Sequence, residues 1–294
     1  MNTQNVILVL SFALGIALKS LKLLSKDDAP VLLRFVLNVC LPPVMILAIY
    51  RATLSLDMLL VPLSAMLVVV ILYFISSFVG GKLKMPRKTF GSFLIGTMIM
   101  NTAFALPYFK AIGSEELARA SLFDIGNSIL IFTFSYYNAI KYGSKPSGGI
   151  QWKKFLSLAP LWAMVIALGI KALSLKIPVT LVSFLEVLGQ PVGVLMMVAL
   201  GLAFSPRMQD FGKAFVAVFI RMGLGFAAGL GLAYLFGLQG IARTVVITGS
   251  ALPVGFNTLI LAEREGLDGG FAATMVSIST LIALFTTPLL IRFF

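Results

Sequence analysis

Long apolar stretches of roughly 20 residues follow one another along almost the whole chain. A helix of that length is enough to cross the hydrocarbon core of a bilayer. Hydrophobic residues make up 59% of the chain and charged residues only 12%, whereas about a quarter of the residues in a soluble domain are charged. The connections between the stretches are too short to hold a soluble domain. The sequence therefore predicts an all-α polytopic membrane protein.

Ten such stretches can be counted, and each is expected to form a transmembrane span. They cover residues 4–24, 29–50, 57–79, 88–111, 115–141, 153–173, 178–204, 211–238, 240–263 and 269–293. The first stretch lacks the basic segment that precedes the apolar part of a signal peptide, and further spans follow it directly. We therefore expect it to stay in the protein as the first span.

Lysine and arginine give the chain a net charge of +12, and they gather in short clusters between the apolar stretches. This distribution is typical of cytoplasmic loops, so we expect no nucleic-acid partner. If both termini lie outside, seven basic residues face outward: Arg51, Lys110, Arg119, Lys171, Lys176, Arg243 and Arg292. Apart from Arg34 and Arg221 within the spans, the other 14 of the 23 face inward. This excess predicts an integral plasma membrane protein, as in a bacterial inner membrane, with both termini outside.

The second half of the chain repeats features of the first half. Pro107 and Pro253 are 146 positions apart, and Pro43 and Pro191 are 148 positions apart. In the fifth and tenth spans, ARASLFDIGNSILIF at 118–132 aligns with FAATMVSISTLIALF at 271–285, an offset of 153 positions. Because a repeat of five spans is odd, the second copy must enter the membrane upside down. The sequence thus predicts the inverted repeat of secondary transporters.

A stretch rich in glycine, serine and proline, YGSKPSGGIQ, lies at 142–151 between the two copies. We accordingly expect the first five-helix repeat at 1–142, a cytoplasmic linker at 143–151 and the second five-helix repeat at 152–294.

The fourth and ninth spans are each interrupted by small residues, a proline and an asparagine, in MNTAFALP at 100–107 and GSALPVGFN at 249–257. Proline breaks or kinks a helix, and a broken helix in lipid is tolerated only where it is buried in protein or lines a cavity. Half-helix N-termini and asparagine amides favour a carboxylate. The candidate substrate-binding residues are Asn101, Thr102, Pro107, Ser250, Pro253 and Asn257. The alternative is that the prolines are simple kinks and the asparagines hydrogen-bond between helices.

Two ionisable residues lie near the middle of spans. Asp124 in the fifth span could carry a proton, because burial favours the neutral form of a carboxyl group, and Asn127 shares its helix face. Arg221 in the eighth span could pair with Asp124 or supply positive charge to the substrate cavity. We expect Asp124, Asn127 and Arg221 to take part in proton or ion coupling. A structural ion pair is the alternative for Asp124.

Other classes of protein find little support in the sequence. Histidine is absent, and the single cysteine, Cys40, lies within an apolar span, so no metal site, cofactor or disulfide is expected. No HExxH or GxSxG motif is present, so we do not expect an enzyme. A channel is a further alternative, which turnover rates would distinguish from a carrier.

The segments NTAFALP, SLFDIGN, ALPVGFNTLILAEREGLD and STLIALFTTPLL resemble the auxin efflux carrier family, and the similarity extends over the whole chain. The resemblance implies ten helices in two inverted five-helix repeats, a fold distantly similar to bile acid:sodium symporters. Spans four and nine would cross at Pro107 and Pro253, and Asn101 and Asn257 would contact the substrate carboxylate. Spans 1, 2, 6 and 7 would form a scaffold, through which two copies could form a homodimer. Spans 3–5 and 8–10 would form a mobile transport domain.

The chain also departs from that family. Its linker is short, so phosphorylation control like that of plant members is not expected. In the third span, Asp57 lies only at the edge. Asp124 is therefore the best candidate for coupling. We expect a secondary carrier of small organic anions, auxin-like carboxylates among them, that works by an elevator movement in the lipid bilayer. The alternative is a sodium-coupled symporter of the bile acid type, although Glu263 lies ten residues beyond Pro253 and fits a sodium site poorly.

Overall fold

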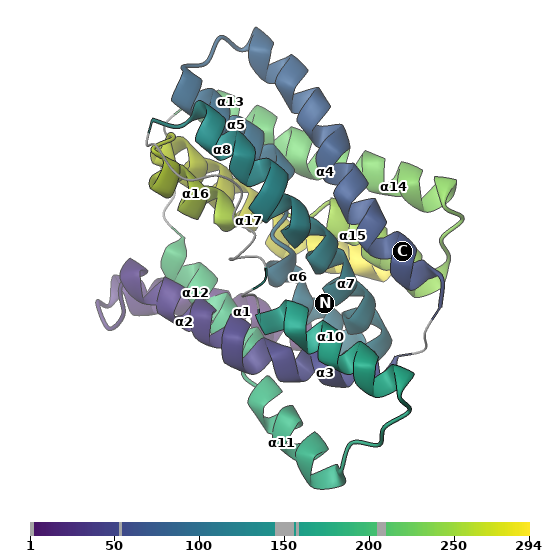
Figure 1. Ribbon diagram of the computed structural model, residues 1–294. Helices are drawn as coiled ribbons and strands as arrows, with labels where there is room; N and C mark the ends of the chain where they lie inside the picture. The colour runs from purple at the N-terminus through teal and green to yellow at the C-terminus, as the bar shows by residue number, and fades with distance from the viewer. Residues whose placement is uncertain (1–2, 53–54, 145–155, 157–158, 205–209) are drawn as a thin grey trace. The chain divides into compact units, whose positions relative to one another are not determined.

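The computed structural model describes residues 3–52, 55–144, 156, 159–204 and 210–294. Within these residues the chain is helical, and the one extended pairing is an isolated antiparallel bridge between Met100 and Val254 (Figure 1). Most of the predicted linker at 143–151 lies outside the described residues, as does the start of the predicted span 153–173.

In the first half, the helical elements are α1 (Thr3–Ser20), η1 (Lys26–Asp28), α2 (Ala29–Phe35), η2 (Val36–Cys40), α3 (Leu41–Arg51), α4 (Asp57–Lys82), α5 (Arg87–Met98), α6 (Thr102–Ile112), α7 (Ser114–Leu130), η3 (Ile131–Ser135) and α8 (Tyr136–Tyr142). In the second half they are α10 (Ala159–Ala172), α11 (Val179–Gly189), α12 (Val192–Ala203), α13 (Phe211–Val218), η4 (Phe219–Leu224), α14 (Gly225–Leu235), α15 (Gly240–Ser250), α16 (Asn257–Glu265) and α17 (Gly269–Phe293).

Six helical runs among the described residues are long and apolar enough to cross a membrane: Lys26–Arg51, Asp57–Lys82, Ser114–Tyr142, Val179–Ala203, Phe211–Leu235 and Gly269–Phe293. The chain is therefore an integral membrane protein. Four of the ten predicted spans do not appear in this set. Two of them correspond to the shorter apolar helices Val6–Ser20 and Ala159–Ala172. The other two are the fourth and ninth, whose helices are broken into α5 with α6 and α15 with α16.

Several of the long runs contain π-helical turns, at η2, η3 and η4. The turn at η2 directly precedes Pro42 and Pro43, whose missing N–H groups cannot continue the regular bonding of the helix. In the seventh predicted span, α11 ends at Gly189 and α12 begins at Val192, so the helix is interrupted at Gln190 and Pro191. Proline thus accounts for the irregularities at η2 and at residues 190–191.

Contacts between helices divide the chain into two compact units, each of which combines segments from both halves of the sequence. Unit 1 consists of Met1–Ser55, Ala103–Ser121 and Leu156–Phe204. Unit 2 consists of Leu56–Thr102, Leu122–Phe155 and Ser205–Phe294. Neither unit coincides with one half of the sequence.

In unit 1, α1 packs along α12, and α3 packs against both α10 and α11 (Figure 1). In unit 2, α4 packs against α5, α14 against α15, and α13 against α17. Aromatic and aliphatic side chains fill the interior of unit 2, and Phe93, Phe271 and Met275 are fully buried there. Many large apolar side chains elsewhere are exposed, among them Phe74, Phe184 and Tyr234, as expected for surfaces that contact lipid.

Four helices of the first half recur in the second half at a nearly constant spacing. The first residues of α4 and α13 are Asp57 and Phe211, 154 positions apart. The corresponding spacing is 153 positions for α5 and α15, 155 for α6 and α16, and 155 for α7 and α17. This spacing agrees with the offset of 153 between 118–132 and 271–285. It disagrees with the offset of 146 between Pro107 and Pro253, so these two prolines are not equivalent positions.

Candidate functional site

The two predicted helix breaks are present in unit 2. Helix α5 ends at Met98 and α6 begins at Thr102, while α15 ends at Ser250 and α16 begins at Asn257. The extended backbone between the helices is paired: the Asn101 N–H donates to the Pro253 carbonyl at 2.9 Å, and the Gly255 N–H donates to the Ile99 carbonyl at 2.8 Å. Each break therefore supplies the hydrogen-bond partners that the other lost when its helix ended.

Gly255 makes this close approach feasible. A Cβ at Gly255 would lie 2.9 Å from the Met100 carbonyl oxygen and would clash with the Ile99 side chain. Any larger residue would push the two backbones apart and break the bonds between them. Pro253 also favours the pairing, because it has no N–H that would require a partner inside the membrane.

Side chains from two further helices complete the hydrogen bonding of the bridge. Asn127 on α7 is fully buried, and its Nδ2 donates to the Met100 carbonyl at 3.0 Å. Its Oδ1 lies 3.4 Å from the Met100 N–H. On the other side, the Val254 N–H donates to Ser279 Oγ on α17 at 3.1 Å. Both residues of the bridge thus have a polar side chain as an additional partner.

Thr102 and Asp124 form a polar contact beside this bridge. The Thr102 hydroxyl donates to the Asp124 carboxylate. Thr102 is the first residue of α6 and is buried, whereas Asp124 is partly exposed. The Asn127 amide also lies 3.5 Å from the Thr102 hydroxyl oxygen, so these residues of α6 and α7 form one connected group.

Arg221 is fully buried, and its guanidinium joins the ends of two helices. Nη1 donates to the Thr97 carbonyl in the last turn of α5 at 3.1 Å, and Nη2 donates to the carbonyl of Ser250, the last residue of α15. Carbonyl groups at a helix C-terminus lack partners within the helix and carry partial negative charge. Arg221 therefore satisfies and neutralises the C-terminal ends of both helices that stop at the breaks.

The position of Arg221 depends on a small neighbour. A Cβ on Gly225 would lie 2.5 Å from Arg221 Nη2 and would also clash with the Ser250 carbonyl oxygen. Arg221 lies within the π-helical turn η4, and Gly225 is the first residue of α14 after it. The glycine leaves the space that the guanidinium occupies between α14 and α15.

An ion pair between Asp124 and Arg221 is not formed among the residues that the structure describes. Of the two alternatives for Arg221, pairing with Asp124 is therefore not the one seen in this conformation. The reason is that each group already has other partners: Asp124 accepts from Thr102, and the Arg221 guanidinium binds two backbone carbonyls.

Pro107 requires a second correction. It was expected at a helix crossing, but it lies inside α6, six residues after Asn101, and belongs to unit 1. Pro107 is the sixth residue of α6, and although it has no N–H to donate, the helix continues through it to Ile112. The break itself is formed by residues 99–101, which contain no proline.

The remaining predicted residues lie at or next to the breaks. Asn101 and Ser250 are buried, and Asn257 is the partly exposed first residue of α16. Sequence analysis missed Thr97, Gly255 and Ser279. Ser279 is one of three hydroxyl residues, with Ser277 and Thr280, in the middle of an apolar span, and this could have drawn attention to it. In the repeat, Ser277 and Thr280 occupy the positions that correspond to Asp124 and Asn127. Thr97 takes part through its carbonyl, which leaves no signal in the sequence.

No cluster of three histidine, cysteine, aspartate or glutamate residues that could hold a metal ion is found in the described part of the chain. Cys40 is a buried free thiol in η2. Three buried hydroxyl groups near the second break, of Thr248, Ser250 and Thr258, have no hydrogen-bond partner among the described residues. These hydroxyl groups could bind a ligand oxygen or a small cation.

Comparison with known proteins gives a consistent assignment. Residues 2–291 match the family described as membrane transport protein. An uncharacterized transporter of Methanothermobacter thermautotrophicus is 26% identical over 297 residues, which cover 98% of this chain and 97% of that protein. An uncharacterized transporter of Methanocaldococcus jannaschii is also 26% identical over 297 residues, with 97% and 96% covered. The chain belongs to the membrane transport protein family, which is the auxin efflux carrier family that its motifs resemble.

Proposed function

We propose that this membrane transporter is a secondary carrier of small organic anions and that the anion binds beside the paired breaks of unit 2. The observation that carries the proposal is the pairing of residues 99–101 with residues 253–255. A broken helix is costly in a membrane unless the freed backbone groups find hydrogen-bond partners. Transporters use such paired breaks to build binding sites near the midplane.

The electrostatics of the breaks favour an anion. The negative ends of α5 and α15 are already compensated by Arg221. What remains at the breaks are the first turns of α6 and α16, whose N–H groups carry partial positive charge. The amides of Asn101 and Asn257 lie at the starts of these helices and can donate to a carboxylate. Auxin-like carboxylates are among the substrates to be tested.

Coupling is proposed to involve Asp124 and its partners Thr102 and Asn127. A negative Asp124 near a bound carboxylate would oppose binding, whereas a neutral one would not. Uptake of a proton by Asp124 would therefore favour binding of the anion, and the effect must be reciprocal. Arg221 contributes indirectly, by positioning α5 and α15 rather than by pairing with Asp124.

We further propose the architecture that the family resemblance implies. The nearly constant spacing of 153 to 155 positions between α4–α7 and their counterparts supports two repeats, at 1–142 and 152–294, joined by the linker at 143–151. The second repeat would be inverted, and spans 3–5 and 8–10 would move as a transport domain against a scaffold of spans 1, 2, 6 and 7. The scaffold would also join two copies as a homodimer. Both termini would lie outside the plasma membrane.

A sodium-coupled symporter is the second candidate. The observation that favours it is the set of three buried hydroxyl groups near the second break, Thr248, Ser250 and Thr258, which lack partners among the described residues. In broken-helix transporters sodium is coordinated by unwound backbone carbonyls at the breaks, and hydroxyl oxygens have lone pairs that can add to such a site. The same groups could instead donate to the carboxylate of an organic anion.

Uptake of radiolabelled organic acids into liposomes that contain the purified protein tests these proposals. Candidate acids can first be selected by their effect on thermal stability. We expect saturable uptake that follows a pH gradient and does not need sodium. Uptake that requires a sodium gradient would favour the symporter, and turnover at ionic conduction rates would indicate a channel. Absence of binding by every organic acid tested, with binding of cations instead, would refute the anion proposal.

A further inference from the structure

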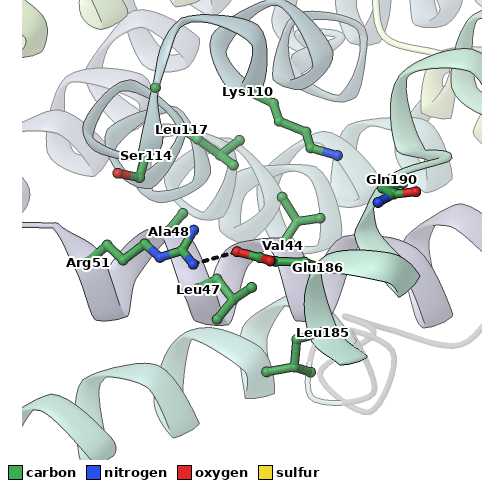
Figure 2. Close-up of a pocket in the computed structure, with 11 residues that line it drawn as sticks. Val44, Leu47, Ala48, Arg51, Lys110, Ser114, Leu117, Leu185, Glu186 and Gln190 are labelled. Atoms are coloured by element: carbon green, nitrogen blue, oxygen red, sulfur yellow. Dashed lines mark hydrogen bonds and ion pairs between the residues drawn. The ribbon is translucent and has the colours of Figure 1, made fainter. Parts of the chain in front are cut away.

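A pocket of about 360 Å³ is lined only by residues of unit 1. None of the residues that form the helix breaks lines it. Residues from α3, α6, α7 and α11 line it, together with the turn between α6 and α7. Its volume is in the range of sites that hold small ligands. Figure 2 shows the side chains around it, with the Arg51–Glu186 ion pair on one side and Lys110 on another.

The pocket lies where several helices end. Arg51 is the last residue of α3, Lys110 is two residues from the end of α6, and Ser114 is the first residue of α7. The helical run Lys26–Arg51 has 26 residues and is therefore about 39 Å long, which is enough to reach from one membrane interface to the other. Arg51 stands at one end of that run, so this end of the pocket would lie near a membrane face, where lipid head groups meet the hydrocarbon region, whereas Gln190 lies in the middle of the run Val179–Ala203.

Its lining combines charged and apolar parts. Val44, Leu47, Leu117 and Leu185 provide an aliphatic surface, and Lys110 and Arg51 provide two positive charges. Among the described residues that line the pocket, Glu186 is the one carboxylate, and it is bound to Arg51 at 2.6 Å. The Glu116 carboxylate lies beside Gly113, which also lines the pocket, so a second negative charge stands at its margin.

The charged groups are available to a ligand. Lys110 donates to the Gly189 carbonyl at the end of α11, which leaves further ammonium protons. The Arg51 and Glu186 side chains are 45% and 48% exposed, and an ion pair as open as this contributes little stability. Exchange of the pair for contacts with a ligand therefore has a small cost.

We propose that this pocket binds an anionic phospholipid, with the phosphate at Lys110 and Arg51 and the start of an acyl chain on the aliphatic surface. Basic pockets between transmembrane helices recognise lipid head groups in this way. The proposal concerns a site in unit 1 that is distinct from the substrate site. Its test does not use transport, so its failure would leave the proposed function intact.

Native mass spectrometry of the full chain, released from detergent, tests the proposal with phosphatidylglycerol and phosphatidylcholine at equal concentrations. We expect phosphatidylglycerol to bind about ten-fold more tightly, because both lipids carry the phosphate but the choline cation of phosphatidylcholine is repelled by Lys110 and Arg51. Equal binding of the two lipids would overturn the proposal. Displacement of phosphatidylglycerol by the same concentration of inorganic phosphate would also overturn it, because the acyl chain would then have no part in recognition.

Two substitutions, one that removes a positive charge from the pocket and one that removes a negative charge, make the test specific. Lys110→Gln removes the charge but keeps an N–H donor for the Gly189 carbonyl, and it should weaken phosphatidylglycerol binding about ten-fold. Glu186→Gln removes the negative charge and releases Arg51, so it should strengthen binding by a few-fold. The matched control is Lys176→Gln, because Lys176 is exposed on unit 1 and does not line the pocket.

A variant that leaves every charge in place covers the case in which Lys110→Gln does not fold. Leu185→Trp fills part of the pocket and should also reduce phosphatidylglycerol binding. Wild-type binding in Leu185→Trp, or weaker binding in Glu186→Gln, would overturn the proposal.

Discussion

The backbone N–H of Asn101 donates to the carbonyl of Pro253 at 2.9 Å, and this bond joins two helix breaks that lie 152 positions apart in the chain. Because the bond uses only backbone atoms, it persists when the Asn101 side chain is changed. The pairing of the breaks and the binding of a substrate by the asparagine side chains can therefore be tested separately.

Replacement of Asn101 or Asn257 by alanine should weaken binding of an organic anion by about 1–3 kcal/mol, because each variant loses a hydrogen bond to a charged group. Isothermal titration calorimetry measures the effect. Asn38→Ala is the control, since Asn38 is exposed in unit 1 and its amide donates to the Arg34 carbonyl of its own helix. Wild-type affinity in both folded variants would mean that the asparagines only connect helices.

Asp124→Asn should bind the anion with the same affinity at every pH. In the wild-type protein, affinity should rise as the pH falls and Asp124 becomes neutral, because a neutral group does not repel the anion. The asparagine should reproduce the affinity that the wild type has at low pH. Calorimetry between about pH 5 and pH 8 tests this, with Asp57→Asn at the start of α4 as the control. A wild-type pH dependence in Asp124→Asn would remove Asp124 as the coupling residue.

Arg221→Met should destabilise unit 2 by about 2–4 kcal/mol, because two buried carbonyls at the ends of α5 and α15 lose a charged donor. The free energy of unfolding in mixed micelles measures the loss. Arg243→Met is the matched control, because Arg243 is an exposed arginine on α15. Arg221→Lys should retain one of the two bonds and fall between the wild type and Arg221→Met. Equal stability of the Arg221→Met and Arg243→Met variants would contradict the role of Arg221 at the helix ends.

Asn127→Ala should cost about 1–3 kcal/mol of stability, because the buried Met100 carbonyl loses its side-chain donor. Ser279→Ala should cost about 1 kcal/mol, because the Val254 N–H loses its acceptor. Both variants should also weaken anion binding, since they loosen the bridge between the breaks. Ser20→Ala is the control, because the Ser20 hydroxyl donates only to the Ile16 carbonyl of its own helix. Anion affinity unchanged in both destabilised variants would separate the bridge from the binding site.

The membrane topology can be tested with single cysteines on a Cys40→Ala background. The excess of lysine and arginine in alternate loops predicts that a cysteine at Thr3 reacts with an impermeant maleimide in intact cells and that one at Ser147 does not. Permeabilised cells, in which both positions should react, provide the control. Labelling at Ser147 alone in intact cells would reverse the orientation.

The sequence by itself determined the features that depend on local properties of the chain. Apolar stretches of sufficient length predict helices that cross the membrane, and the starts of α4 and α17 agree with their predicted starts at 57 and 269. The segments 100–107 and 249–257 indicated two breaks, and the helices do end at Met98 and Ser250, although Pro107, which was expected at the first break, lies inside α6. The 153-position offset between 118–132 and 271–285 agrees with the spacing of 153 to 155 positions between α4–α7 and their counterparts in the second half.

Only the tertiary structure decided which groups meet. The sequence placed Arg221 and Asp124 near the middle of spans, but it could not show that Arg221 binds the carbonyls of Thr97 and Ser250. Every residue has a carbonyl group, so a sequence cannot reveal which helix ends converge on one guanidinium. The prediction that Pro107 lies at a helix crossing was wrong for a related reason. Proline restricts its own backbone, but the hydrogen-bond partners available in space determine where the helix ends. The pairing of Asn101 with Pro253 is likewise a property of the folded chain, because it joins backbone atoms from segments 152 positions apart.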